Sequence, residues 1–279
     1  MLSQLYSQIN WHAPWYAPLI IPPLFIQPYC CVKDWLNASL TQPIMNYQHK
    51  AIRFVPQDDL PVDTAYETYI AKTGNIPTRD NLHDLLGGLI WLNFPKTKAV
   101  FNQLHQQDIE KTGIQPTRSV IRNILTLFDE NGGVVVSSDM TVLQGLQSFN
   151  WQSALFDNRN SWLNHQTNFF PIGHALLEKL IEPRDSITAH VILLYVAPDW
   201  HSQDVASQRV SLDNFLSQFF LTLPQAHHLT SKMFQPLPVL GIAQFRLGQS
   251  RDFYANKTIF REPRSAPPSP IYSLSLTKQ

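Results

Sequence analysis

The pattern of hydrophobic and polar positions predicts an amphipathic helix over residues 80–93. Its leucines recur at intervals of three and four residues and so share one helical face: Leu82, Leu85, Leu86, Leu89 and Leu92. Gly87 and Gly88 interrupt this helix, although a glycine inside a helix costs about 1 kcal/mol relative to alanine. This pair needs an explanation in terms of packing or of a functional site.

The remaining pattern predicts a mixed α/β (α+β) fold that is rich in helices and has a small sheet. A continuous apolar run with β-branched residues predicts a buried strand near residues 187–197. The stretch near residues 124–137 contains the turn dipeptide Asn131-Gly132 beside a run of valines, which predicts a β-hairpin. The sequence has no internal repeat and no clear linker, so we expect a single globular domain.

Composition divides the chain into three segments. Residues 1–56 are rich in aromatic residues and proline, and we expect them to pack on the core. Residues 57–264 are expected to form the main globular domain, and the serine- and proline-rich residues 265–279 a loose tail. Hydrophobic residues make up 44% of the 279 positions, which is enough to build a full core.

Charge and N-terminal composition exclude several classes of protein. The chain has 21 Lys and Arg against 21 Asp and Glu, and this balance argues against general electrostatic binding of nucleic acid or of an anionic membrane. Prolines break the apolar run near the N-terminus, so it predicts neither a signal sequence nor a spanning helix. The two cysteines are adjacent, at Cys30 and Cys31, and fit a reducing compartment. We therefore expect a cytoplasmic protein.

Several familiar catalytic motifs are absent from the sequence. The chain contains no G-x-G-x-x-G, no G-x-x-x-x-G-K-[ST], no H-E-x-x-H and no G-x-S-x-G. Dinucleotide enzymes, P-loop nucleotidases, classical zinc hydrolases and α/β-hydrolases are therefore disfavoured.

A candidate site lies on the helix that carries the two glycines. His83 and Asp84 precede Gly87 and Gly88 by four residues, so each glycine lies one turn from a polar side chain. Close packing of another segment against the glycines is one interpretation, and the helix by itself favours it. The other is a pocket wall in which His83 and Asp84 are metal ligands or acid–base groups. The predicted binding residues around them are Arg79, Asn81, Gly87, Gly88 and Trp91.

Two other segments contribute candidate residues. Asp129 and Glu130 are adjacent carboxylates that suit a divalent cation or acid–base chemistry, although ordinary turn chemistry also explains them. His174 begins a predicted helix, and Glu178 follows four residues later, where it can orient the imidazole.

Six segments, taken in order, resemble a bacterial family known as the domain of unknown function DUF3025. They are PTRDNLHDLLGGLIWLNFPKTKA, LTLFDENGG, FFPIGHALLEKL, ITAH, LPVLGI and IFREPR. The resemblance runs from about residue 50 to residue 264, and it implies a single-domain bacterial protein without an assigned activity or cofactor. The sequence GIAQF at residues 241–245 departs from the more turn-like segment expected in relatives. The shared segments contain five of the candidate residues: His83, Asp84, Asp129, Glu130 and His174.

These observations lead to three functional hypotheses. The first is a metal-assisted hydrolase of small molecules; its divalent ion would be held by His83, Asp84, Asp129 and His174, with Glu130 or Glu178 as general base or as a group that orients the ligands. The second is a non-catalytic protein that binds a small molecule or an anion, through tryptophans and arginines. The third is a protein-interaction or assembly factor. We place the enzyme first, because a polar site is the most economical explanation of the helical glycines; the sequence does not predict the oligomeric state.

Overall fold

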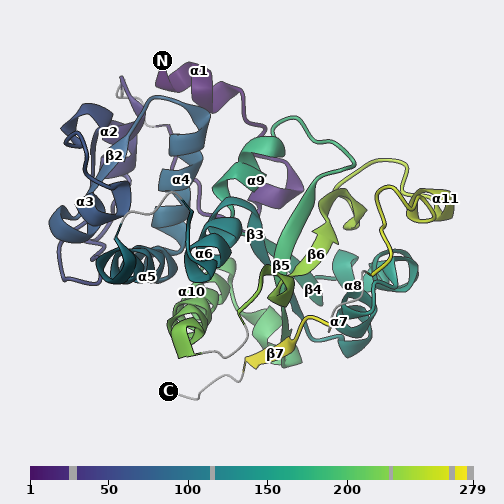
Figure 1. The fold of residues 1–279 in the computed structure, drawn as a ribbon. Coiled ribbons are helices and arrows are strands. Elements are labelled where there is room, and N and C mark those ends of the chain that lie inside the picture. Colours follow the sequence, from purple (N-terminus) through teal and green to yellow (C-terminus); the bar gives the residue numbers. More distant parts are fainter. Residues whose placement is uncertain (25–29, 114–116, 226–228, 264–267, 275–279) are drawn as a thin grey trace. The chain divides into compact units, whose positions relative to one another are not determined.

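The computed structural model describes residues 1–24, 30–113, 117–225, 229–263 and 268–274 (Figure 1). Its contacts divide the chain into two compact units. Unit 1 consists of Met1–Trp11, Ile20–Thr126 and Arg209–Leu229. Unit 2 consists of His12–Leu19, Leu127–Gln208 and Thr230–Gln279. The three segments predicted from composition do not correspond to these units, and their boundaries stay a prediction.

Unit 1 is mainly helical. Its helices are α1 (Leu2–Ser7), α2 (Val32–Ala38), α3 (Tyr66–Thr73), α4 (Leu82–Asn93), α5 (Pro95–Thr112), the first part of α6 (Val120–Asn131) and most of α10 (Val205–Thr222). Two short parallel strands, β1 (Arg53–Pro56) and β2 (Asn75–Thr78), form its sheet. The helix predicted at residues 80–93 is confirmed as α4, and its N-terminus is capped by Asn81, whose Oδ1 accepts the Asp84 backbone N–H at 2.8 Å.

Unit 2 is built around a five-stranded sheet (Figure 1). Its strands are β3 (Gly132–Ser137), β4 (Thr167–Pro171), β5 (Thr188–Val196), β6 (Gln235–Pro238) and β7 (Ile271–Leu274). Strand β3 pairs antiparallel with β4 and parallel with β5. On its other edge, β5 pairs antiparallel with β6 along its first half and parallel with β7 along its second half. The helices of this unit are the end of α6, the start of α10, α7 (Met140–Gln147), α8 (Arg159–Leu163), α9 (His174–Lys179) and α11 (Arg251–Tyr254).

Several very short helical segments connect these elements. They are the 3-10 helices η1 (Pro14–Tyr16), η2 (Gln57–Asp59), η4 (Pro198–Ser202), η5 (Leu223–Gln225), η6 (Ser231–Met233) and η7 (Val239–Gly241), and the π-helix η3 (Gln152–Asp157).

The mixed α/β class is confirmed, and so is the buried strand near residues 187–197, which is β5. Both central strands bury apolar side chains on both faces, and every residue of β3 is buried. Where the sequence predicted a loose tail, Ile271–Leu274 form β7 and pair with β5. Residues 265–267 and 275–279 of that tail lie outside the described residues.

The hairpin predicted near residues 124–137 is wrong. Residues up to Asn131 belong to helix α6, and β3 begins at the next residue. Ile124, Leu125 and Phe128 are all buried, and their spacing of three and four residues is helical. Gly132 packs against Phe128, where a Cβ would lie 2.5 Å from the aromatic ring. The Asn131-Gly132 dipeptide therefore marks the end of a helix.

No helix among the described residues combines the length and the apolar character that crossing a bilayer requires.

Candidate functional site

His174 has a carboxylate on each side of its ring, within unit 2. Its Nδ1 atom lies 3.9 Å from Oδ2 of Asp129, and its Nε2 atom lies 3.8 Å from Oε2 of Glu130. The side chain of His174 is 10% exposed, against 22% for Asp129 and 35% for Glu130. The group is therefore an imidazole buried beside two carboxylates that solvent still reaches.

The corrected secondary structure explains how both carboxylates reach one imidazole. Asp129 and Glu130 occupy the last turn of α6, where neighbouring side chains are about 100° apart around the axis. In a strand, successive side chains would point to opposite faces of a sheet, and only one carboxylate would face His174. His174 itself is the first residue of α9.

Gly173 allows α9 to begin directly against the end of α6. Its backbone N–H donates to the Gly132 carbonyl at 2.9 Å. A Cβ on Gly173 would collide with the Glu130 carbonyl oxygen and lie 2.6 Å from the Asn131 nitrogen. Only glycine fits here, so this residue determines how closely His174 approaches the acidic pair. Gly173 was not among the site residues predicted from the sequence, although a glycine immediately before a helix that starts with histidine was visible.

Two further hydrogen bonds hold α9 in place. The Lys179 ammonium donates to Oδ1 of Asn131 at 2.6 Å, and the Tyr16 hydroxyl donates to the Leu177 carbonyl at 3.1 Å. Burial raises the pKa of Tyr16 above its usual value, which keeps the hydroxyl protonated as a donor. Both ends of α9 are therefore anchored, and His174 is held on a positioned helix.

The electrostatic setting favours a cation. The C-terminal end of a helix carries partial negative charge, and each carboxylate placed there is disfavoured by roughly 0.3–1 kcal/mol. Imidazole nitrogens and carboxylate oxygens bind zinc at about 2.0–2.2 Å, so an ion bound by both can hold the two atoms up to about 4.2 Å apart. The 3.8 Å between Nε2 of His174 and Oε2 of Glu130 lies within that reach.

Asp129 lies 3.9 Å from Nδ1 of the imidazole, slightly beyond hydrogen-bond distance, and could orient the ring after a small shift. A histidine that binds metal through one nitrogen usually donates its other N–H to a carboxylate or carbonyl, which fixes the tautomer and the ring. Asp129 lies on the Nδ1 side, opposite Glu130. The geometry therefore suits Glu130 as ligand and Asp129 as orienting partner. The sequence predicted Asp129 as ligand and Glu130 as general base or orienting group, and these roles stay predictions. Glu178, the other predicted base, is half-buried one turn further along α9.

The other predicted ligands, His83 and Asp84, lie in unit 1 in the first turn of α4. Asp84 binds Arg79 strongly: its Oδ2 accepts the Arg79 backbone N–H at 2.6 Å and Nε–H at 3.1 Å, and its Oδ1 accepts from Nη2 at 2.9 Å. This contact raises the pKa of Arg79 above its usual value. The predicted set of four metal ligands therefore includes residues of both units, and it stays a prediction.

The predicted binding residues of α4 are occupied by packing and capping contacts within unit 1. A Cβ on Gly88 would lie 2.8 Å from Cδ2 of Leu36, so the Leu36 side chain fills the space beside this glycine. Gly87 is partly exposed. Trp91 is buried, with the Lys98 ammonium 5.7 Å from the centre of its ring. Close packing is thus sufficient to explain Gly88, and the binding role of these residues stays a prediction.

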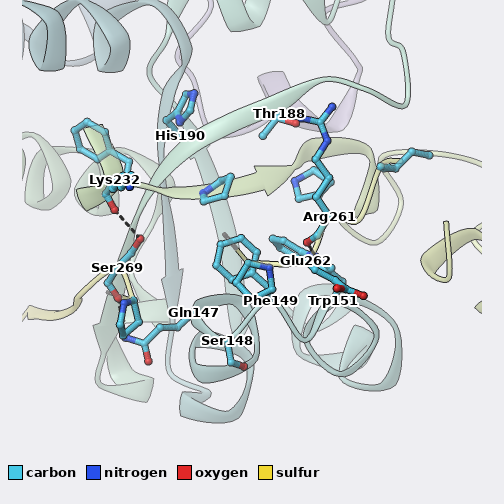
Figure 2. Close-up of a pocket in the computed structure, with 16 residues that line it drawn as sticks. Gln147, Ser148, Phe149, Trp151, Thr188, His190, Lys232, Arg261, Glu262 and Ser269 are labelled. Carbon is cyan, nitrogen blue, oxygen red and sulfur yellow. Dashed lines mark hydrogen bonds between the residues drawn. The ribbon is translucent and has the colours of Figure 1, made fainter. Parts of the chain in front are cut away.

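A cavity of about 660 Å³ in unit 2 was not predicted from the sequence (Figure 2). It is lined by residues from the β5–β6 edge of the sheet, from the turn after α7 and from residues 259–263 and 268–269. Its polar groups include His190, Lys232 and Arg261. The sequence placed no site here because these segments are far apart in the chain.

Comparison with known proteins identifies the family. No curated protein and no solved structure matches the chain. The family model described as "Protein of unknown function (DUF3025)" matches residues 52–264, which include His83, Asp129, Glu130 and His174. The match covers most of the chain and confirms the resemblance of the six segments. The chain therefore belongs to the DUF3025 family.

Proposed function

We propose that the protein is a metal-assisted hydrolase whose divalent cation is held by His174 and Glu130. The observation that carries this proposal is the separation of 3.8 Å between Nε2 of His174 and Oε2 of Glu130, with Asp129 on the other side of the ring. A carboxylate 3.9 Å from Nδ1 favours the tautomer that carries its proton on Nδ1, which would leave the lone pair of Nε2 for an ion shared with Glu130. His83 and Asp84 are further candidate ligands from the sequence.

The chemistry follows from the types of residue. A divalent ion supplies Lewis acidity and lowers the pKa of a bound water from 15.7 to about 7, which suits hydrolysis at neutral pH. Glu178 is the candidate general base, because it is the next carboxylate along the helix that carries His174. The substrate class is a small molecule with an ester, amide or phosphoester bond.

The cysteines support the proposed cytoplasmic location. The Cys31 thiol donates a hydrogen bond to Oδ2 of Asp34 at 2.9 Å. Burial, followed by the contact with Asp34, raises the pKa of Cys31 above its usual value, so the thiol is protonated and unreactive. A protonated thiol at Cys31 suits a reducing compartment.

Metal binding tests the proposal directly. The protein is purified without chelators or a His-tag, analysed for metals, and titrated with Zn²⁺, Mn²⁺ and Co²⁺ by calorimetry. We expect about one ion per chain, lost in His174→Gln and Glu130→Gln, and an affinity reduced roughly 10- to 100-fold in Asp129→Asn. Glu182→Gln is the matched control, because Glu182 is an exposed carboxylate of the same unit with an 84% exposed side chain.

The rate at which the protein hydrolyses nitrophenyl esters, anilides and phosphates should then increase with the fraction of protein that has bound metal. His83→Ala and Asp84→Asn in the same titration test the additional ligands predicted from the sequence. Metal binding that survives unchanged in both His174→Gln and Glu130→Gln would overturn the proposal. So would a folded wild-type protein that binds none of the three ions.

A further inference from the structure

The cavity of unit 2 has one wall formed by the sheet. Thr188 and His190 are two residues apart on β5 and so share one face, while Ala189 and Val191 are buried on the other. Pro238 pairs with Thr188 and Pro236 pairs with His190 in the register of β5 and β6. This wall therefore combines two apolar proline rings with a hydroxyl and an imidazole.

A second wall is aromatic and held in place. The ring centres of Phe149 and Trp151 lie 5.3 Å apart with the planes 78° from each other. The Trp151 indole N–H donates to the Arg261 carbonyl at 2.7 Å, which also fixes the chain at Arg261. Phe149 has a φ of +59°, a conformation that is uncommon for an aromatic residue and that is often found at ligand sites. These two rings form an apolar corner against which a planar group can pack.

The turn after α7 is tied to the opposite rim of the cavity. The Gln147 amide donates to the Ser269 carbonyl at 2.7 Å, and the Ser269 hydroxyl donates to the Lys232 carbonyl at 3.3 Å (Figure 2). Three segments that are remote in sequence thereby form one preorganised cavity. Its volume of about 660 Å³ is typical of a pocket for a small organic molecule.

The charges that line the cavity favour an anion. Lys232 and Arg261 are cationic, and the one carboxylate among its described lining residues, Glu262, accepts from Lys257 at 2.6 Å. In the described part of the chain, no carboxylate lies within ion-pair distance of Lys232 or Arg261. The Arg261 side chain points toward Thr188 across the mouth of the cavity (Figure 2). A guanidinium in this position can bind a carboxylate through two parallel hydrogen bonds.

His190 adds a neutral polar group. Burial lowers the pKa of His190 below its usual value, and the positive charge of Lys179 lowers it further. The imidazole is therefore uncharged at neutral pH and serves as a hydrogen-bond donor or acceptor.

We propose that this cavity binds a planar aromatic carboxylate, whose ring lies against Phe149, Trp151 and the prolines and whose carboxylate binds Arg261. Its lining includes neither of the metal ligands proposed above, and the proposal does not depend on them. It places a small-molecule site in unit 2 that uses none of the α4 residues.

Binding of 2-naphthoate, measured by calorimetry and by Trp fluorescence, tests the proposal. We expect saturable binding with a Kd of about 1 mM or tighter, and an approximately tenfold loss of affinity in Arg261→Gln. Arg184→Gln is the matched control, since Arg184 is an exposed arginine of the same unit whose side chain is 76% exposed. Phe149→Leu should weaken binding while the protein stays folded, because Phe149 is only half-buried.

Two comparisons make the outcome decisive. The neutral amide 2-naphthamide should bind the wild-type protein about tenfold more weakly than the acid, and Arg261→Gln should not weaken it further. Glu130→Gln removes a proposed metal ligand and should bind 2-naphthoate as tightly as the wild type does. A failure of the metal proposal would therefore not change the expected binding of 2-naphthoate. The inference is overturned if 2-naphthoate does not bind at millimolar concentration, or if Arg261→Gln binds it as tightly as the wild type.

Discussion

The backbone of Gly173 packs against the carbonyl group of Glu130 so closely that no side chain fits between them. A Cβ on Gly173 would lie 2.6 Å from the carbonyl carbon of Glu130. The next residue, His174, begins α9, and its Nε2 atom lies 3.8 Å from Oε2 of Glu130. A contact between two backbones thus determines the geometry of the candidate metal site.

This relationship predicts that Gly173→Ala destabilises the protein. The added methyl group must displace α9 from α6, and such overpacking typically costs about 1–3 kcal/mol. Urea denaturation should show the loss, and calorimetry should show weaker metal binding in the folded variant. Ala175→Gly on the same helix is the control; it should cost about 1 kcal/mol and leave the metal affinity unchanged. A Gly173→Ala protein as stable as the wild type would show that the backbone contact is looser than described.

A second prediction separates packing from ligand binding at α4. Gly88→Ala should destabilise the protein by up to about 2 kcal/mol, because overpacking against the buried side chain of Leu36 costs about 1–3 kcal/mol and the better helix propensity of alanine offsets about 1 kcal/mol. In a Leu36→Ala background the same change should cost much less, since the space is then free. A double-mutant cycle in urea measures this coupling. If Gly88→Ala costs the same in both backgrounds, packing against Leu36 is not the reason for the glycine.

Helix α4 and strand β5 could be predicted from the sequence, because the hydrophobic pattern of each matches the environment that it occupies in the fold. Helix α4 has apolar residues at helical spacing and a polar cap at Asn81, and β5 is a short apolar run rich in β-branched residues. Both patterns depend on neighbours in the chain, so they were visible without tertiary information.

The error at residues 124–137 came from two competing local signals. Asn131-Gly132 and the valines of β3 indicated strand and turn, while Ile124, Leu125 and Phe128 carried the helical spacing that the structure follows. The mistake affected the site as well, because a strand would have separated the side chains of Asp129 and Glu130. His174 is 44 positions beyond Glu130, and the sequence has no signal for the register that brings them together.

A third prediction concerns the start of α5, where the residue at the N-cap position, Phe94, provides no side-chain cap. Asp213 of α10 serves instead: it accepts from the backbone N–H groups of Lys96 and Thr97 at 3.0 and 2.8 Å and from the Thr97 hydroxyl at 2.7 Å. Asp213→Asn replaces an acceptor by an amide donor at this buried position and should destabilise the protein by about 1–3 kcal/mol.

Chemical denaturation of Asp213→Asn checks this cap. Asn214→Ala is its control, because that residue makes a surface contact with the Lys96 ammonium and should change stability by less than about 0.5 kcal/mol. Equal effects from the two substitutions would contradict the capping role of Asp213.

The last prediction is a pH dependence of stability from His190. Burial, reinforced by Lys179, lowers the pKa of His190 in the folded protein below the unfolded value of about 6.5. Between these two pKa values, the unfolded chain therefore binds more protons than the folded chain does. The stabilisation is complete above about pH 6.5 and is lost as the pH falls through the lower folded pKa.

Urea denaturation near pH 7.5 and pH 5.5 should show a smaller decrease in stability for His190→Gln than for the wild type. His201, whose pKa is also lowered by burial, retains part of the dependence. The exposed substitution His49→Gln should follow the wild type, and an identical decrease in His190→Gln would show that this imidazole is free to protonate in the folded state.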